Sequence, residues 1–500
     1  MGPSCNCRGS SRVFPSVRQP RSPATELRKY VHATVISPFS TQLPSDASST
    51  GLDPEFLDRP EGPTHPHDDD GNKEPADSND LIRLCDLLET TPADLLRFES
   101  TPDGVRGVYL NHGVNEGDII LSLPLESCLQ DDKPPAWLQN IDDEDKLSSN
   151  YNPSNWATRL GASLLDLQLR QRQEGDKDIG QGHVFWLSLL PDPEFLRASL
   201  PVHWPEETVQ NARSTALELA VDSSYFARAE AVEELVYTLK SNSNLTASDL
   251  SDDELRQLCS NALDVVQTRA CRLWNDKDDT PLRVLAPIFD FFNHGSIKVR
   301  GDAGANARFQ LEDDQTLIVR AVKSIQANEE VLIDYGDSAR PAWRCLHSYG
   351  FVPQYNQIPG PNEEATADSE DEDEDEDEDN EAEVYMDGVR YVVGPSQVPF
   401  DMVATAFSSD HPVAEDEEDV EVSLTPEIAL KLADRISDVA YYLLLEPEED
   451  LHDDLPAATA SPFQVISSRL AASLRWSQHR ILMACALGLR EFAADATSFL

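Results

Sequence analysis

The sequence has few basic residues and no long apolar segment, and each shortage excludes a class of protein. Its 500 residues carry 40 Lys and Arg against 91 Asp and Glu, which gives a formal net charge of −51. Proteins that bind nucleic acid by neutralising phosphates need clustered positive charge, so no direct nucleic-acid binding is expected. The longest apolar runs, at 439–445 and 481–489, are far shorter than the about 20 residues of a membrane-spanning helix. We therefore expect no membrane partner.

Several motifs of ordinary enzymes and metal proteins are also missing. The eight cysteines form no C-x-x-C pair, so the sequence indicates neither a structural zinc site nor a thioredoxin-like motif. We expect free thiols and no metal. The phosphate-binding loop, the G-x-S-x-G elbow and H-E-x-x-H are absent as well.

The first 78 residues are rich in Pro, Ser, Asp and Gly and show no sustained periodicity, which predicts a disordered N-terminal tail. Residues 1–45 are basic and contain one acid, Glu26, as an organelle transit peptide would. Their prolines disfavour an amphipathic helix, so we prefer an ordinary tail. The expected location is cytoplasmic or nuclear, and organelle import is the less favoured alternative.

The region from 81 to 353 alternates between β-rich and helical patterns, which predicts an α+β fold. A short amphipathic helix is expected at 81–88, and residues 150–275 favour helix. Residues 105–110 and 119–124 read as two strands paired across a turn. Further strands are expected at 283–292, 307–311, 316–321 and 330–335, with a hairpin turn at 312–315.

The composition changes sharply after this region. Fifteen acidic residues and no basic one lie between Glu363 and Glu383. Like-charge repulsion keeps such a block extended, so we predict an acidic disordered linker at 361–384. A docking tail for a basic protein is the alternative. Residues 385–500 are predicted to be helical, and Thr425 followed by Pro426 is typical of a helix start.

Three motif segments occur in order within residues 81–353: Gly104–Tyr109, Pro287–Gly295, and Asn328–Gly336 followed by Ser348–Pro353. Together they resemble SET-domain methyltransferases, and they are most similar to the subfamily of the plant Rubisco large-subunit lysine methyltransferase and the actin-histidine methyltransferase. Two positions depart from the common pattern. Gly295 replaces a frequent Ser, and Asn328 replaces a frequent Gly, although Asn tolerates a left-handed turn nearly as well.

The resemblance implies a β-rich SET core with a pseudoknot over 81–353. A helical insertion is expected at about 130–285, and an all-α substrate-binding domain at 385–500. It also implies S-adenosyl-L-methionine as the cofactor. Because the transferred methyl is bound to a positive sulfonium, the protein mainly has to align donor and acceptor and exclude water.

By resemblance, Tyr335 is the catalytic residue, since the matching tyrosine faces the transferred methyl. Tyr349 is expected on the substrate side of the pocket. The resemblance places these residues at the cofactor: Gly104, Val105, Arg106, Arg269, Asp290, Asn293, His294, Tyr335 and Phe351. Arg269 matches an arginine near the cofactor carboxylate, where a guanidinium fork is suitable.

The leading hypothesis is a protein-lysine N-methyltransferase that acts on a non-histone protein with an exposed and possibly basic target site. We expect it to act as a monomer. A protein-histidine N-methyltransferase is the first alternative, because relatives share the core and differ in the acceptor pocket. A catalytically silent SET-like scaffold, binding basic partners through its acidic block, is the second.

Overall fold

The structure is a computed structural model of the whole chain, and it describes most of residues 78–498. The predicted N-terminal tail, except Ser78, and nearly all of the predicted acidic linker lie outside the described residues. The described ranges are 78–90, 92, 94–100, 106–139, 155–172, 180–241, 250–275, 280–295, 304–313, 315–335, 341–353, 382–386, 388–395, 397–410, 423–445 and 461–498.

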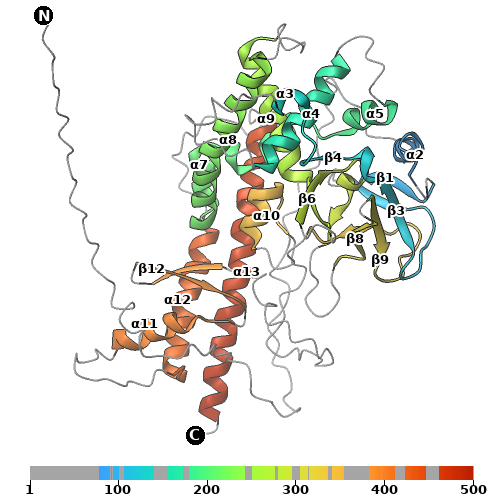
Figure 1. Cartoon of the computed structure of the whole chain (residues 1–500). Helices are drawn as coiled ribbons and strands as arrows, with labels where there is room; N and C mark the ends of the chain where they lie inside the picture. Colours follow the sequence, from blue (N-terminus) through green and yellow to red (C-terminus); the bar gives the residue numbers. More distant parts are fainter. Residues whose placement is uncertain are drawn as a thin grey trace, which may run out of the picture.

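The β-rich part contains three small sheets, on the right in Figure 1. The five-stranded sheet has the order β3 (Ile119–Pro124), β9 (Thr316–Ala321), β8 (Ala307–Glu312), β10 (Leu332–Ile333) and β7 (Asn293–His294). Its β10 runs parallel to both neighbours, and the other pairs are antiparallel. The second sheet is β1 (Leu96–Ser100) with β2 (Arg106–Leu110), and the third has the order β4 (Leu129–Gln130), β6 (Thr280–Leu285) and β5 (Cys271–Asn275).

The predicted pairing of 105–110 with 119–124 is wrong. Strand β2 pairs with β1, and β3 pairs with β9, almost two hundred residues further along the chain. In β1, the buried Leu96 and Phe98 alternate with Arg97 and Glu99, a two-residue period that is typical of a strand and was overlooked. Sequence proximity therefore does favour a hairpin for β2, but with the segment before it, and only the partner of β3 is distant in sequence.

Other local predictions are confirmed. Strands β8 and β9 form the predicted hairpin, with Glu312 opposite Thr316. Asn328 has φ of 68°, so it adopts the left-handed turn that Gly provides elsewhere. The stretch 283–292 is a strand only as far as Leu285, because a sharp turn and a short 3-10 helix, η6 (Phe289–Phe291), follow.

Helices cover the β-rich part and fill the insertion, shown above and to the left in Figure 1. Within the insertion the helices end at Arg269, and the remainder of the predicted insertion forms β5 and β6. A capping box between Ser251 and Glu254 starts α9. The helices are α2 (Ser78–Leu87), α3 (Ala136–Gln139), α4 (Trp156–Arg172), α5 (Gln181–Leu189), α6 (Pro193–Ser199), α7 (Glu206–Asn211), α8 (Thr215–Ser241), α9 (Asp252–Arg269) and α10 (Ala342–Tyr349), with 3-10 turns η2 (Leu125–Ser127) and η4 (Pro201–His203).

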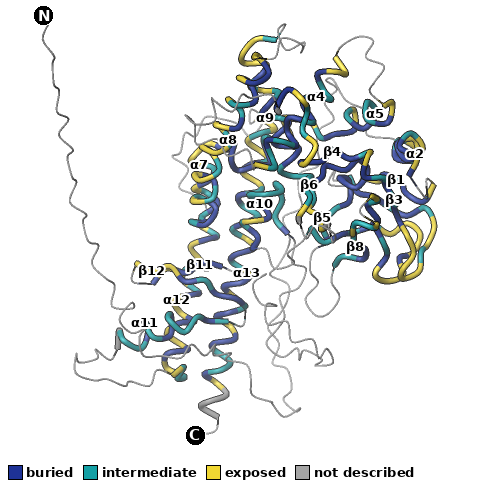
Figure 2. Tube along the Cα trace, viewed as in Figure 1, coloured by how far each residue is buried: buried dark blue, intermediate teal, exposed yellow. Residues whose placement is uncertain are grey.

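One apolar core joins these sheets to the insertion, so the two do not form separate units. It includes Leu84 of α2, Leu121 of β3, Leu164 of α4 and Val266 of α9, each fully buried. Figure 2 shows this buried interior running from the sheets into the helices. Burial of this size is the main favourable term in folding, and here it holds the end of α9 against the sheets.

The C-terminal part is mainly helical, as predicted, with α11 (Phe400–Asp410), α12 (Pro426–Leu444) and α13 (Pro462–Ser498). Thr425 caps α12 by accepting a hydrogen bond from the backbone N–H of Ile428. The all-α prediction needs one correction, because β11 (Ala382–Met386) and β12 (Val389–Val393) form a hairpin. Gly388 makes its turn with φ of 78°, and the acidic residues nearby hid its apolar runs.

Helix α13 runs from the insertion to the end of the molecule and packs on α12, α6, α7 and α10 (Figure 1). A third apolar cluster joins Leu474 of α13 to Leu346 of α10 and Leu217 of α8. Among the described helices, none combines the length and apolarity that a membrane span requires.

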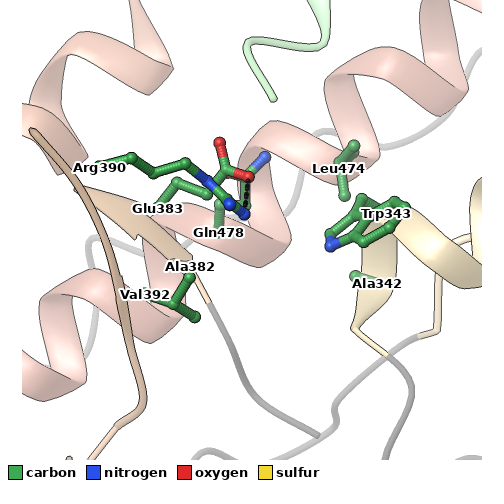
Figure 3. A pocket seen from close by; sticks show the side chains of 8 residues that line it. All are labelled: Ala342, Trp343, Ala382, Glu383, Arg390, Val392, Leu474 and Gln478. Carbon is green, nitrogen blue, oxygen red and sulfur yellow. Dashed lines mark hydrogen bonds and ion pairs between the residues drawn. The ribbon is translucent and has the colours of Figure 1, made fainter. Parts of the chain in front are cut away.

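The hairpin β11–β12 is tied to the insertion by Glu383. Its carboxylate accepts hydrogen bonds from the backbone N–H groups of Thr215 and Ala216, both at 3.1 Å, at the start of α8. Arg390 donates to the same carboxylate at 2.9 Å. Figure 3 shows this pair on one side of a pocket whose other side is Trp343 and Leu474. A carboxylate at a helix N-terminus satisfies unpaired N–H groups and complements the helix dipole.

We expect Glu383→Gln to lower the free energy of unfolding by about 1–3 kcal/mol, because the amide carries no charge and brings an N–H donor against the donors of α8. Thermal and denaturant unfolding would measure the change. Asp434→Asn is the matched control, since Asp434 forms an exposed ion pair with Arg490 and its side chain is 76 % exposed. Equal effects of the two variants would contradict the tie.

Candidate active site

A pocket lies where the end of α9, the helix η6, β10 and the end of α10 meet. It is open to solvent, and its empty space, counted together with the open mouth, is about 370 Å³. The walls are mainly apolar or aromatic, and five lining residues carry a polar or charged group, two of them tyrosines. The lining residues are Thr268, Arg269, Ala270, Cys271, Phe289, Asp290, Phe292, Phe309, Ile333, Tyr335 and Tyr349.

Aromatic rings from two other segments gather around Tyr335. Its ring centroid lies 5.2 Å from His294, 5.0 Å from Tyr349 and 6.3 Å from Phe351. His294 also lies 5.9 Å from Phe351. Both belong to the motif segments quoted above, and the Phe351 segment lies against His294. The connecting residues 336–340 lie outside the described residues.

The hydroxyl of Tyr335 has a fixed partner. It donates a hydrogen bond to the backbone carbonyl of Phe292 at 2.8 Å. Burial raises the pKa of Tyr335 well above its usual value. The hydroxyl therefore stays protonated at neutral pH, and its free lone pair is the group available to a ligand in the pocket.

Arg269 and Asp290 place a buried charge pair on the pocket wall. Arg269 Nη1 lies 3.8 Å from the Asp290 carboxylate and donates to the Asp290 backbone carbonyl. Trp186 of α5 donates its indole N–H to both carboxylate oxygens at 3.3 Å. Burial raises the pKa of Asp290 to about 6, against the lowering effect of Arg269 and Trp186. The Nε of Arg269 is buried and has no hydrogen-bond partner among the described residues.

Arg106 braces the pocket from outside. Its guanidinium lies 4.7 Å from the ring of Phe98 and 4.5 Å from that of Phe291, and it donates to the Leu189 carbonyl at 2.9 Å. Burial, together with the nearby charge of Arg269, lowers the pKa of Arg106 to about 10, so it remains charged at neutral pH. Its guanidinium holds η6 and α5 against β2 and is not part of the pocket lining.

Asn293 links β2 to Glu330, which lies two residues before β10. Its Nδ2 donates to the Arg106 carbonyl at 3.0 Å and to Glu330 Oε1 at 2.8 Å. Burial raises the pKa of Glu330. Gly107 is required for this contact, since a Cβ there would lie 2.2 Å from Glu330 Oε1. The carboxylate can reach Asn293 only because position 107 has no side chain.

Gly295, where SET proteins often have Ser, is explained by close packing. A Cβ at this position would lie 2.3 Å from the backbone nitrogen of Ala305. The N–H of Gly295 donates to the Ile333 carbonyl at 3.0 Å, which extends the parallel pairing of β7 with β10. The loop after Asn293–His294 therefore has no room for a side chain here.

Sequence-predicted site residues fall into three groups. Arg269, Asp290, Tyr335 and Tyr349 line the pocket. His294 and Phe351 belong to the aromatic group around Tyr335, while Asn293 and Arg106 support it. Gly104 and Val105 lie outside the described residues. Their predicted cofactor and substrate roles stay predictions.

Three residues that support the pocket carry no signal of this in the sequence. Glu330 lies within a motif segment, yet nothing in the sequence linked it to Asn293. Trp186 lies more than a hundred residues before Asp290, and no local pattern marks it. Phe309 closes the pocket against Phe289, with ring centroids 4.8 Å apart, but reads as an ordinary strand residue. Within the described residues, no three His, Cys, Asp or Glu side chains are grouped so as to hold a metal ion.

Comparison with known proteins agrees with this geometry. Residues 105–336 match the family model described as SET domain. A comparison with curated proteins found no match. The β-rich core and insertion are thus a SET domain, followed by a helical C-terminal part.

Solved structures of SET enzymes resemble the chain at low identity. The SET domain of LSMT bound to lysine and AdoHcy gives a TM-score of 0.45 at 14% identity, covering 83% of this chain and 90% of that one. Rubisco LSMT bound to sinefungin and monomethyllysine gives 0.45 at 13%, covering 84% and 92%. Rubisco LSMT bound to AdoMet gives 0.42 at 14%, again covering 84% and 92%.

The buried Asp290 carboxylate predicts a pH dependence of stability. In the folded chain its pKa is about 6, above the 3.8 of an exposed Asp, so the folded chain binds this proton more tightly. Its contribution to the free energy of unfolding therefore falls as pH rises from about 4 to about 6, and is constant above that.

Relative to Asp290→Asn, the native chain should lose up to about 3 kcal/mol of stability across this window. Thermal unfolding of both proteins from pH 4 to pH 7.5 would measure it. A stability difference that does not change with pH would show that Asp290 is not buried as a charge.

Proposed function

We propose that the protein is an S-adenosyl-L-methionine-dependent protein methyltransferase whose acceptor is a lysine of a non-histone protein. The observation that carries the proposal is the buried Tyr335 hydroxyl, held on the Phe292 carbonyl inside an aromatic pocket of a SET domain. The solved SET structures that resemble the chain were determined with AdoMet, AdoHcy or lysine bound.

The residues present suit this cofactor. Arg269 has a buried Nε–H without a partner, and a cofactor carboxylate would accept from it. His294 and Phe351 offer aromatic surface beside Tyr335 for the remainder of the molecule. When bound, the cofactor supplies a methyl group on a positive sulfonium, and transfer exchanges one S–C bond for one N–C bond.

The role proposed for Tyr335 is alignment. Because its pKa is raised by burial, the hydroxyl cannot act as a tyrosinate base at neutral pH. Its proton is directed to Phe292, so its oxygen can accept weak C–H···O contacts from a polarised methyl group. The acceptor amine, with an ordinary pKa near 10.4, has to lose its proton before it attacks. Because Tyr335 is not available as a base, this proton would be lost to solvent.

A lysine acceptor is supported by the lining. Phe289, Phe292, Phe309 and Tyr349 give the pocket apolar surface that would suit an aliphatic chain, and aromatic faces attract an alkylammonium group. A histidine acceptor is the alternative, since its ring would also pack on aromatic walls. The net charge of −51 favours a basic target protein through long-range attraction.

We expect Tyr335→Phe to lower turnover at least about 100-fold while the fold is kept, because one hydroxyl that positions the reacting groups is lost. Transfer of labelled methyl from S-adenosylmethionine into proteins of a cell extract would measure it.

Tyr391→Phe is the matched control, since it removes a hydroxyl that bonds Thr405 in the C-terminal core, away from the pocket. That variant should label the same protein band as the native chain. Mass spectrometry of the band identifies lysine or histidine. If the native chain neither binds cofactor nor labels any protein, the proposed activity is wrong.

A further inference from the structure

The turn that leads into the pocket has a strained backbone. Ile288 has φ of 70° and ψ of −52°, and the N–H of Phe289 donates to the Pro287 carbonyl at 2.8 Å. These features define a γ-turn of the rare form with positive φ. Positive φ is a genuine outlier for a β-branched residue, because its Cβ and branches crowd the backbone. Nothing in the sequence marks this position.

The surroundings hold the strained turn in place. Ile288 is fully buried in the main core. The helix η6 follows at once, and the N–H of Asp290 donates to the Ala286 carbonyl at 3.0 Å. Trp186 holds the Asp290 side chain from the other direction. Strained conformations persist only where their environment determines them this fully, and they gather at functional sites.

The turn directs two carbonyl groups to the polar side chains of the pocket. Downstream of Ile288, the Asp290 carbonyl accepts from Arg269, and the Phe292 carbonyl accepts from the Tyr335 hydroxyl. The rings of Phe289 and Phe292 line the same pocket. One sharp reversal after β6 therefore sets the positions of Arg269 and Tyr335. It also sets the two parts of the pocket wall that Phe289 and Phe292 form.

We propose that Ile288 is a positioning residue, and that its strained γ-turn locks the Asp290 and Phe292 carbonyls so that Arg269 and Tyr335 are pre-organised for methyl transfer. The inference rests on the proposed function. It adds that this site stores backbone strain, and that relief of the strain costs activity.

The test compares Ile288→Ala with Ile288→Gly. Both variants lose the buried side chain, but only glycine relieves the strain, because it has no Cβ. At an ordinary position glycine is less stable than alanine. Here we expect the glycine variant to unfold roughly 1–3 °C higher than the alanine variant. Ala286→Gly is the matched control, since this neighbour is also fully buried and has no positive φ, and it should melt lower than the native chain.

Activity should change in the opposite direction. The glycine variant frees the turn, so its kcat for methyl transfer should be about tenfold lower than that of the alanine variant. A residue with a merely structural role would make the more stable variant the more active one. Equal kcat values, or a glycine variant that melts lower than the alanine variant or fails to fold when the alanine variant folds, would overturn the inference.

Hydrogen exchange of the native chain supplies a measurement that does not depend on either variant folding. The amides of Phe289–Phe292 should exchange as slowly as those of β6, because a locked turn opens only with the core. Faster exchange at these amides would overturn the inference. The melting temperatures of the two variants and the amide exchange rates can be measured without enzymatic activity. An inactive native chain would therefore reject the proposed function, while these two measurements would still test the strained turn.

Discussion

The hydrogen bond between the Tyr335 hydroxyl and the Phe292 carbonyl is the contact on which the site is organised. It joins two segments 43 residues apart, and both belong to the central sheet region. For this contact to form, β10 must pair in parallel with β7, and the chain must reverse sharply at Ile288. Parallel pairing needs a long connection, which here contains the β8–β9 hairpin. The strand order of the sheet and the position of the Tyr335 hydroxyl therefore depend on each other.

Buried charge and backbone strain around this contact lower the stability of the fold. The Asp290 carboxylate is enclosed beside Arg269, and a buried ion pair is weak evidence for stability. Two devices offset the cost of enclosing this charge. Trp186 donates to the carboxylate, and the rings of Phe98 and Phe291 shelter the neighbouring Arg106. Groups kept at such a cost are expected where chemistry, rather than stability, determines the arrangement.

The C-terminal helices are coupled to this site through α13 and α10. Leu474 packs with Leu346, and α10 carries Tyr349 into the pocket three residues later. Glu383 ties the hairpin to the first turn of α8, and Gln267 of α9 donates to the His347 carbonyl at 2.9 Å. These apolar and hydrogen-bonded contacts connect the C-terminal helices to the helix that ends in Tyr349.

The sequence by itself determined the class of fold, the helix start at Thr425, the β8–β9 hairpin and the segments that meet around Tyr335, because these depend on local periodicity, caps, turns and motifs. Only the tertiary structure decided the partner of β3, the approach of Trp186 to Asp290, and the link from Glu330 to Asn293. It also decided the positive φ of Ile288, a residue whose type argues against that conformation. Such features depend on non-local packing, which outweighs the preference of any single residue and leaves no trace in its neighbours.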